Sequence, residues 1–272
     1  MFLARAPAPG LRGLVIGYWF LEDLLGAHAG APIWTSPSPG AALTIHFGSP
    51  NATADGNPVP RASLLGLQTR ARSWRSGPET AFVMVMLTVP GLARLFPETG
   101  LGTRDDLLDL GAVAGDHVAM RLVDGLVAAW QPARVAVELD RWLLARLDNR
   151  RAFDSPRFAA AYAQLRLHGR VDAAAAAVGV STRQLQRWAL AYSGLTPKQL
   201  FDLERLHASL NAVQTGRGDP SSGYSDQAHQ IRSWKRRLGT TPGQYARTRP
   251  SLMAAHFTQD VDPACPGWSH WL

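Results

Sequence analysis

The sequence predicts an α+β protein with several domains: a β-rich, barrel-like N-terminal domain with flanking helices, then an all-α C-terminal domain. Three observations predict this class. Short apolar runs fill residues 11–110, helical periodicity begins near residue 115, and residues 179–244 contain an internal repeat. A chain of 272 residues is long enough for two domains that each bury a core.

The first 110 residues alternate between short apolar segments and turn residues. The predicted strands cover residues 14–21, 42–47, 64–67 and 81–89. Clusters of Gly, Pro and Ser separate them at residues 36–40, 49–60 and 76–78. Several short strands at this spacing predict a small barrel or sandwich.

Helical spacing follows these strands. Val118, Leu122 and Leu126 recur at four-residue steps, and residues 135–147 continue the helical pattern. A linker is predicted at residues 149–154, where the apolar periodicity stops. The helices therefore flank the β-rich region and precede the C-terminal domain.

The C-terminal domain contains two similar copies of one pattern. The first copy has Gly179-Val180-Ser181, a polar helix, and Gly194-Leu195-Thr196-Pro197. The second copy has Gly223-Tyr224-Ser225, another polar helix, and Gly239-Thr240-Thr241-Pro242. Each copy predicts a tight turn, a capped helix rich in Arg or Gln, and a second turn that opens another helix. Two helix-turn-helix units are therefore expected in tandem.

Side-chain caps predict where these helices begin. The predicted caps are Asp172, Ser181, Thr196 and Thr241. The last three have Gln three residues later, which is the capping-box pattern. The helix after Ser181 is predicted over residues 182–191, and the helix after Asp172 is short and rich in Ala.

Charge is divided unevenly between the two halves. Residues 1–154 carry 14 Arg and 14 Asp or Glu, so they are neutral. Residues 155–250 carry 14 Lys or Arg against 5 Asp or Glu, a net charge of +9. A basic half that also contains the repeat is typical of a domain that binds the phosphate groups of nucleic acid.

The predicted helix over residues 182–191 has the chemistry of a major-groove reader. Leu185 and Trp188 lie on one stripe, so the polar side chains lie on another. Arg pairs with guanine edges and Gln with adenine edges. The residues predicted to contact DNA here are Ser181, Thr182, Arg183, Gln184, Gln186 and Arg187. The alternative is a polar face of a helical bundle, which the order of Ala-rich helix, Gly179 turn and cap disfavours.

The second copy carries a family signature. It reads Gly223-Tyr224-Ser225-Asp226-Gln227-Ala228-His229, then Arg232, then Gly239-Thr240-Thr241-Pro242. With this signature, residues 155–247 resemble the DNA-binding domain of AraC/XylS-type transcriptional regulators. The resemblance implies seven helices in two helix-turn-helix units joined by a long helix, with residues 182–191 and 226–237 as recognition helices. It implies DNA contacts from Ser225, Asp226, Gln227, His229, Arg232, Lys235 and Arg236.

The chain departs from the family pattern in both units. Residues 217–222 contain Gly and Pro where the family has a full helix, so no supporting helix is expected there. Gln230 stands where the family has a bulky apolar residue. Ala189 fills the usual Phe position of the first unit, with Trp188 adjacent as a substitute. These departures predict a second unit that is loosely packed or has lost specific reading, and place the DNA affinity mainly on the first unit.

The N-terminal domain resembles the uncharacterised domain that precedes many bacterial regulators of this type. Residues 17–22, 38–48 and 65–70 carry the resemblance. It implies a sensor or dimerisation domain over residues 1–150, followed by a DNA-binding domain over residues 155–250 and a tail over residues 251–272.

Four side chains of the N-terminal domain have two interpretations. Trp19, Trp34, His46 and Trp74 either line an apolar pocket with a polar handle or form ordinary barrel core, and the core is favoured. His46 has no nearby His or Glu at ligand spacing, so no metal site is expected there.

The function expected from these patterns is a sequence-specific DNA-binding transcriptional regulator, modulated by its N-terminal domain. The alternative is a small-molecule-binding protein with a degenerate DNA-binding half. An enzyme is not expected, because no Ser-His-Asp order, paired carboxylates, phosphate loop or metal cluster is present, so neither catalytic residues nor a cofactor is assigned. Double-stranded DNA is the expected partner, with a small-molecule effector, a homodimer and contact with RNA polymerase left open.

Composition suggests where the protein resides. The lone Cys265, interpreted as an incidental thiol, excludes an internal disulfide. No run approaches the roughly 20 apolar residues of a membrane span, and the first 14 residues do not resemble a signal peptide. We expect a soluble cytoplasmic protein, bacterial and associated with the nucleoid through DNA.

Overall fold

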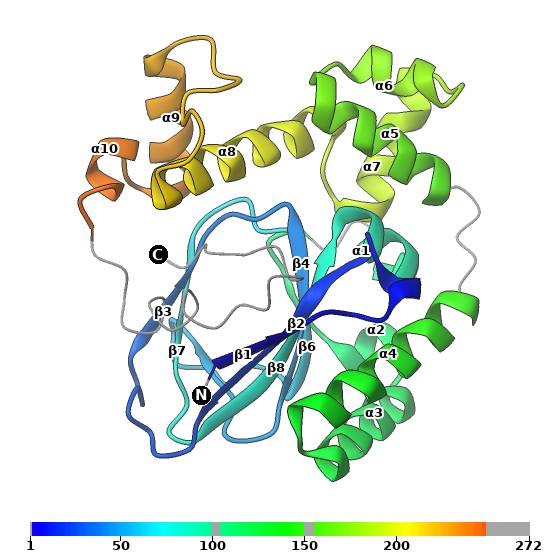
Figure 1. Ribbon diagram of the computed structural model, residues 1–272, viewed down its shortest axis with the longest axis vertical. Helices are drawn as coiled ribbons and strands as arrows, with labels where there is room; N and C mark the ends of the chain where they lie inside the picture. Colours follow the sequence, from blue (N-terminus) through cyan, green and yellow to red (C-terminus); the bar gives the residue numbers. More distant parts are fainter. Residues whose placement is uncertain (1, 100–103, 150–154, 249–272) are drawn as a thin grey trace.

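The computed structural model describes residues 2–99, 104–149 and 155–248 (Figure 1). In this part of the chain strands predominate up to Asp109 and helices follow, which confirms the predicted order of a β-rich domain with flanking helices and an all-α domain. Most of the predicted linker, the tail at residues 251–272 and Cys265 lie outside the described residues.

The larger sheet has six antiparallel strands in the order β1-β2-β8-β4-β6-β9. Their bounds are β1 (Phe2–Arg5), β2 (Val15–Asp23), β4 (Gly40–His46), β6 (Ala62–Leu65), β8 (Thr80–Thr88) and β9 (Leu107–Asp109). Val83 of the central strand β8 lies opposite Phe20 of β2 and Ile45 of β4. The predicted strands at residues 14–21, 42–47, 64–67 and 81–89 fall on β2, β4, β6 and β8.

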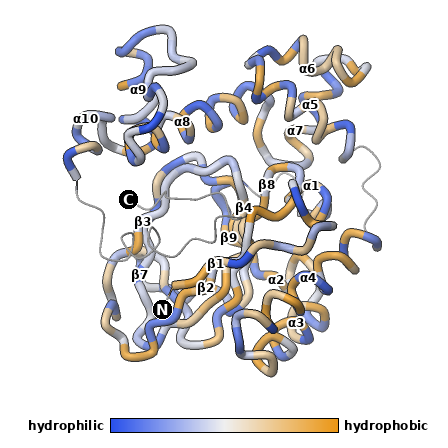
Figure 2. The backbone as a smooth tube through the Cα atoms, in the orientation of Figure 1, coloured by the Kyte–Doolittle hydropathy of each residue, from blue (hydrophilic) through white to orange (hydrophobic). Residues whose placement is uncertain are grey.

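Alternating side chains of β8 separate two apolar cores, because successive residues of a strand point to opposite faces. Val83 and Val85 join the core beneath the helices. Phe82 and Met84 join a second cluster that includes Ile33 of the smaller sheet. Figure 2 shows the corresponding concentration of hydrophobic residues along the strands of the larger sheet.

The smaller sheet has three strands in the order β3-β7-β5. Their bounds are β3 (Pro32–Thr35), β5 (Ala52–Thr53) and β7 (Arg72–Arg75). Within the described residues the strands form two separate open sheets in place of a closed barrel. These three strands were not predicted, because they are only two to four residues long.

Helices cover the face of the larger sheet that is opposite the smaller sheet (Figure 1). Their bounds are η1 (Pro9–Leu11), α1 (Val89–Leu95), α2 (Leu110–Ala114), α3 (Asp116–Ala129) and α4 (Pro132–Asn149). The predicted helical spacing from residue 115 corresponds to α3 and α4, and Leu122 and Leu126 are buried. The helices therefore flank the sheet as expected.

Helix α1 was not predicted, because it contains Pro90 and Gly91. Thr88 accepts a hydrogen bond from the backbone N–H of Gly91 at 2.9 Å, and Pro90 occupies an early position where its missing N–H does no harm. A Cβ on Gly91 would lie 1.9 Å from the carbonyl oxygen of Leu14, so only glycine allows this close approach.

The C-terminal domain is helical. Its helices are α5 (Ser155–His168), α6 (Val171–Ala177), α7 (Thr182–Ser193), α8 (Pro197–Thr215), α9 (Gln227–Leu238) and α10 (Pro242–Tyr245). The long helix α8 runs between the group α5–α7 and the pair α9 and α10 (Figure 1). The predicted absence of a helix over residues 217–222 is confirmed, since they form turns and bends.

The predicted cap of α6 is wrong. Arg170 occupies the N-cap position without a side-chain cap bond, and Asp172 lies inside the first turn. Asp172 instead accepts from Arg170 at 2.7 Å. An acidic residue in the first turn still interacts favourably with the helix dipole, which explains the sequence signal.

Candidate nucleic-acid interface

Helix α7 has a polar face that is exposed to solvent and an apolar face that is buried. Ser181 accepts from the backbone N–H of Gln184 at 3.1 Å, so the helix begins at Thr182 as predicted. Leu185, Trp188 and Ala189 are buried against the other helices. The reciprocal half of the predicted capping box is not formed, because Gln184 accepts instead from the guanidinium of Arg187.

An arginine braces the turn before α7. Arg157 of α5 donates to the carbonyl oxygen of Val178 at 2.8 Å and lies 5.9 Å from the Trp188 ring. Gly179 has φ +68, a left-handed conformation that favours glycine. The brace and the glycine together fix the angle between α6 and α7.

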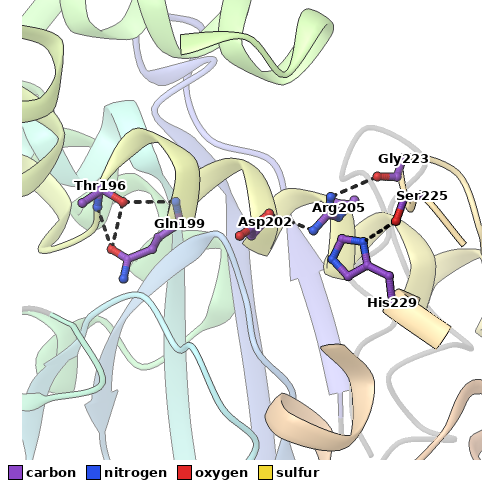
Figure 3. Close-up of polar contacts among 7 residues, drawn as sticks. All are labelled: Thr196, Gln199, Asp202, Arg205, Gly223, Ser225 and His229. Carbon is purple, nitrogen blue, oxygen red and sulfur yellow. Dashed lines mark hydrogen bonds and ion pairs between the residues drawn. The ribbon is translucent and has the colours of Figure 1, made fainter. Parts of the chain in front are cut away.

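The second unit repeats this brace. Arg205 of α8 donates to the carbonyl oxygen of Gly223 at 3.0 Å and to Asp202 at 2.8 Å (Figure 3). Its guanidinium lies 4.6 Å from the Tyr224 ring. Gly223 also has positive φ, at +78. The sequence duplication therefore extends to a contact that the repeated motif does not reveal, because the two arginines lie on helices outside the repeated turns.

Helix α9 begins with an acidic cap. Asp226 accepts from the backbone N–H of His229 at 2.7 Å. The hydroxyl oxygen of Ser225 lies 3.2 Å from Nδ1 of the His229 ring (Figure 3). This backbone bond, with the hydroxyl of Ser225, keeps the pKa of Asp226 below its usual value. A carboxylate at a helix N-terminus opposes phosphate binding there, whereas the neutral Ser181 leaves the N-terminus of α7 open to an anion.

A buried polar network takes the place of the missing supporting helix. Ser209 of α8 donates to the carbonyl oxygen of Pro220 at 2.5 Å, and Gln230 of α9 donates to the same oxygen at 2.5 Å. The indole N–H of Trp234 donates to the Ser209 hydroxyl at 3.0 Å. Gln230 therefore anchors the loop to both helices, and the second unit is held by hydrogen bonds rather than loosely packed.

The predicted DNA contacts all lie at the surface. Gln184 and His229 are half-buried, and the other predicted contacts are exposed. These exposed residues are Ser181, Thr182, Arg183, Gln186, Arg187, Ser225, Asp226, Gln227, Arg232, Lys235 and Arg236. Arg183 and Gln186 in particular are not buried against the rest of the molecule. Their assignment as DNA contacts stays a prediction.

Helix α9 also touches the N-terminal domain. Arg237 donates to the carbonyl oxygen of Thr69 at 3.2 Å, and its own carbonyl oxygen accepts from Ala71 at 2.8 Å. Ala71 packs against the apolar cluster of Leu206, Trp234 and their neighbours. Helix α9 thus has one face turned to solvent and one packed on α8, and it touches the N-terminal domain near its C-terminal end.

A cavity of about 110 Å³ lies between the two sheets of the N-terminal domain. Trp19, His46 and Trp74 line it, which supports the pocket interpretation for these three. Trp34 is 46% exposed and is not among the lining residues. Burial lowers the pKa of His46 to about 4, so its ring is neutral near pH 7.

Neither a metal cluster nor a membrane-spanning helix occurs within the described ranges. Those residues contain no group of three or more His, Cys, Asp or Glu placed to hold a metal ion. None of their helices combines the length and the apolarity that crossing a bilayer requires.

Two capped helices behind braced glycine turns, joined by α8 in a basic domain, define a helix-turn-helix DNA-binding protein. Residues 174–248 match the family described as helix-turn-helix domain. This part of the chain is an AraC-type helix-turn-helix domain, which confirms the resemblance in its sequence.

Similar proteins include ToxT from Vibrio cholerae O395, with 12% identity, coverage of 84% of this chain and 96% of that chain, and a TM-score of 0.43. Wild-type ToxT from V. cholerae strain SCE256, solved with an unsaturated fatty acid bound, has 11% identity, covers 84% and 94%, and has a TM-score of 0.42. The AraC-like transcriptional activator CuxR has 10% identity, covers 64% and 66%, and has a TM-score of 0.20. No curated protein matches the chain.

Proposed function

We propose that the protein is a transcriptional regulator that reads duplex DNA through the exposed face of α7, with α9 as a second, weaker reader. The observation that carries this proposal is the solvent exposure of Thr182, Arg183 and Gln186 on a helix whose opposite face is fully packed. Arg and Gln on a rigid helix match guanine and adenine edges in the major groove.

The difference between the two helix starts supports the order of affinity. Ser181 caps α7 without adding charge, whereas Asp226 places a carboxylate at the start of α9. Lys235 and Arg236 lie near the other end of α9, where they can attract phosphate. We therefore assign specific reading mainly to α7 and backbone attraction mainly to α9.

Selection from a pool of random duplexes tests this function. The full chain is incubated with the pool, bound DNA is recovered and sequenced, and the affinity is measured across salt concentrations. One recovered half-site indicates one working reader, and two half-sites in the same orientation indicate two. Weak binding that is indifferent to sequence would instead favour the alternative, a small-molecule-binding protein with a degenerate DNA-binding half.

The remaining parts of the function concern partners. The protein acts on chromosomal DNA in the cytoplasm, and its N-terminal domain modulates DNA binding through a small-molecule effector. The cavity between the sheets supports the effector. Analytical ultracentrifugation with and without the recovered duplex tests whether the chain binds as a homodimer or as a monomer.

A further inference from the structure

The cavity between the two sheets has an uncharged lining. Among the described residues, its lining includes Trp, Met, Phe, Thr and Ser side chains but no Asp, Glu, Lys or Arg. An ionised group without a partner in such surroundings pays a large desolvation penalty. The volume of about 110 Å³ is several times the roughly 10–15 Å³ that one water needs. The lining therefore selects a compact, uncharged, largely apolar occupant.

One hydrogen-bond donor in this lining is unused. His46 is 2% exposed, and its Nε2 accepts from the backbone N–H of Asn51 at 3.4 Å. The neutral ring therefore carries its hydrogen on Nδ1, which makes no hydrogen bond of normal geometry within the described residues. Its neighbouring acceptor is the backbone of Arg61, which partly offsets the lowering of the His46 pKa by burial. A buried donor without a well-formed bond is unfavourable, so an occupant that supplies an acceptor gains this bond.

We propose that the cavity binds a compact, uncharged, largely apolar molecule with a hydrogen-bond acceptor for His46, and that occupancy is transmitted to α9 through residues 68–71. This inference deepens the proposed function and rests on it for the role of α9. The ligand class follows from the lining alone, and the transmission follows from a separate chain of contacts.

The transmission begins with a side chain that lines the cavity. Gln68 donates to the hydroxyl of Thr35 at 3.0 Å, and Trp74 donates to the same hydroxyl at 3.1 Å. All three residues line the cavity. An occupant that displaces the Gln68 amide moves the next residue, Thr69, whose carbonyl oxygen accepts from Arg237 of α9.

The segment is rigid enough to carry this displacement. Asp105 accepts from the backbone N–H of Thr69 at 2.6 Å and from its hydroxyl at 2.5 Å. Asp105 has φ 56, which makes it the one residue other than glycine with positive φ in the described chain. A residue other than glycine keeps this conformation only where the surrounding contacts fix it, so Asp105 and Thr69 are held together firmly. Ala71 completes the link through its bond to the Arg237 carbonyl oxygen.

Three shape-matched probes test the ligand class. Acetophenone is neutral with an acceptor, benzoate is anionic, and α-methylstyrene is neutral without an acceptor. Equilibrium dialysis of the full chain at pH 7 should give a Kd for acetophenone about tenfold or more below that for benzoate. His46→Leu should weaken acetophenone about three- to tenfold and leave α-methylstyrene within about twofold. Thr44→Val, an isosteric change in the same lining, is the control and should leave acetophenone within about twofold.

The contrary results are equally defined. Benzoate binding as tightly as acetophenone, or no acetophenone binding at millimolar concentrations, overturns the ligand class. Equal weakening of the ketone and the hydrocarbon by His46→Leu overturns the role of Nδ1.

Hydrogen exchange tests the transmission without DNA. Acetophenone should change amide exchange in α9 and residues 68–71 by about threefold or more and leave α7 unchanged. Arg237→Gln should abolish the response of α9, whereas Arg236→Gln, the same charge change at an exposed neighbour, should preserve it. An unresponsive α9 at saturating ligand, or an intact response in Arg237→Gln, overturns the transmission.

Duplex selection and hydrogen exchange, both measured on the full chain, distinguish failure of this inference from failure of the proposed function. If no duplex is selected but α9 still responds to acetophenone, the proposed function fails and the coupling stands. If a duplex is bound but its affinity and the exchange of α9 are both indifferent to acetophenone, the coupling fails and DNA binding stands.

Discussion

Ser209 is a single hydroxyl that joins three parts of the second helix-turn-helix unit. It accepts from Trp234, accepts from Gln230 at 3.3 Å and donates to Pro220 of the connecting loop. Ser209 and Gln230 are both buried, so these groups have no access to water. The hydroxyl of Ser209 therefore joins α8, α9 and the connecting loop in the unit that lacks a supporting helix.

Ser209→Ala should destabilise the protein by about 1–3 kcal/mol, because it leaves the buried N–H of Trp234 without an acceptor. Urea unfolding followed by tryptophan fluorescence measures the loss. Ser222→Ala, the same change at an exposed position, is the control and should shift the free energy of unfolding by less than about 0.5 kcal/mol. Equal stability of the two variants would contradict the role of Ser209.

His46 makes stability depend on pH. Burial lowers the pKa of His46 from 6.5 to about 4, so on acidification the unfolded chain takes up this proton before the folded one. Stability should therefore fall as the pH drops from about 6.5 to 4 and level off below, by at most about 3 kcal/mol from this group. Burial also lowers the pKa of His207 to about 4 and acts in the same direction, whereas it raises the pKa of Glu204, which acts in the opposite one.

The measurement is the urea midpoint at pH 7, 5.5 and 4.5 for the wild type and His46→Leu. The variant should show a shallower decline over this range, because only the contribution of His46 is removed. Parallel declines in the two proteins would show that His46 does not titrate as its burial requires.

Among the elements, the two turns behind the reading helices depend on glycine and arginine together. A Cβ on Gly223 would lie 3.0 Å from Cδ of Arg205 and would also sit at φ +78. Gly223→Ala should destabilise the second unit by about 1–2 kcal/mol through its backbone conformation alone. Gly243 lies in α10, where an added Cβ would have no atom within 4 Å and φ is not positive, so Gly243→Ala is the matched control.

Hydrogen exchange of α9 reads out the turn directly. Exchange should accelerate in Gly223→Ala and stay near the wild-type rate in Gly243→Ala. Acceleration in both variants, or in neither, would contradict the requirement for glycine at position 223 of this turn.

The two reading helices should differ in their share of DNA binding. Arg183→Ala removes a guanidinium from the exposed face of α7 and should weaken binding to the selected duplex by about 1–3 kcal/mol, with relaxed preference at one base pair. Arg232→Ala in α9 should weaken binding less and flatten the slope of log K against log salt by about 0.9, as a phosphate contact does. Arg170→Ala, which removes an exposed charge paired with Asp172, is the control for net charge.

Fluorescence anisotropy across salt concentrations measures all three variants. Binding of the selected duplex by Arg183→Ala at the wild-type affinity would contradict its assignment. A larger loss in Arg232→Ala would reverse the order proposed for the two helices.

The elements differ in how far the sequence predicts them, and the reason is the range of their interactions. Helix α7 was predicted because its cap, its turn glycine and its apolar stripe all lie within a dozen residues. Helix α1 was not predicted, because glycine is needed at position 91 to make room for the backbone of Leu14, which is far away in the chain. Among the site residues, the pairing of Arg205 with Gly223 and of Arg237 with Thr69 depends on tertiary packing, so no local pattern reveals it.

At the scale of the whole molecule, one apolar core joins the two domains. The cluster beneath the larger sheet continues through Leu92 of α1 into Phe158 of α5, Leu185 of α7 and Leu200 of α8. Helix α1 contacts α5, α7 and α4 as well as β4 and β8. Because α7 is packed on the same core as the sheet, the DNA-reading half and the N-terminal half should not unfold independently.

Leu92→Ala tests this continuity. Leu92 is 0% exposed, and its truncation should cost about 2–5 kcal/mol of unfolding free energy through lost burial and a cavity. If the core is continuous, differential scanning calorimetry should show one transition that moves down as a whole, by about 6–12 °C for a loss of ~3 kcal/mol. Leu167→Ala, the same truncation at a residue that is 73% exposed, should barely move it. Two separate transitions, of which Leu92→Ala moves only one, would mean that α1 joins the domains by contact without making them fold together.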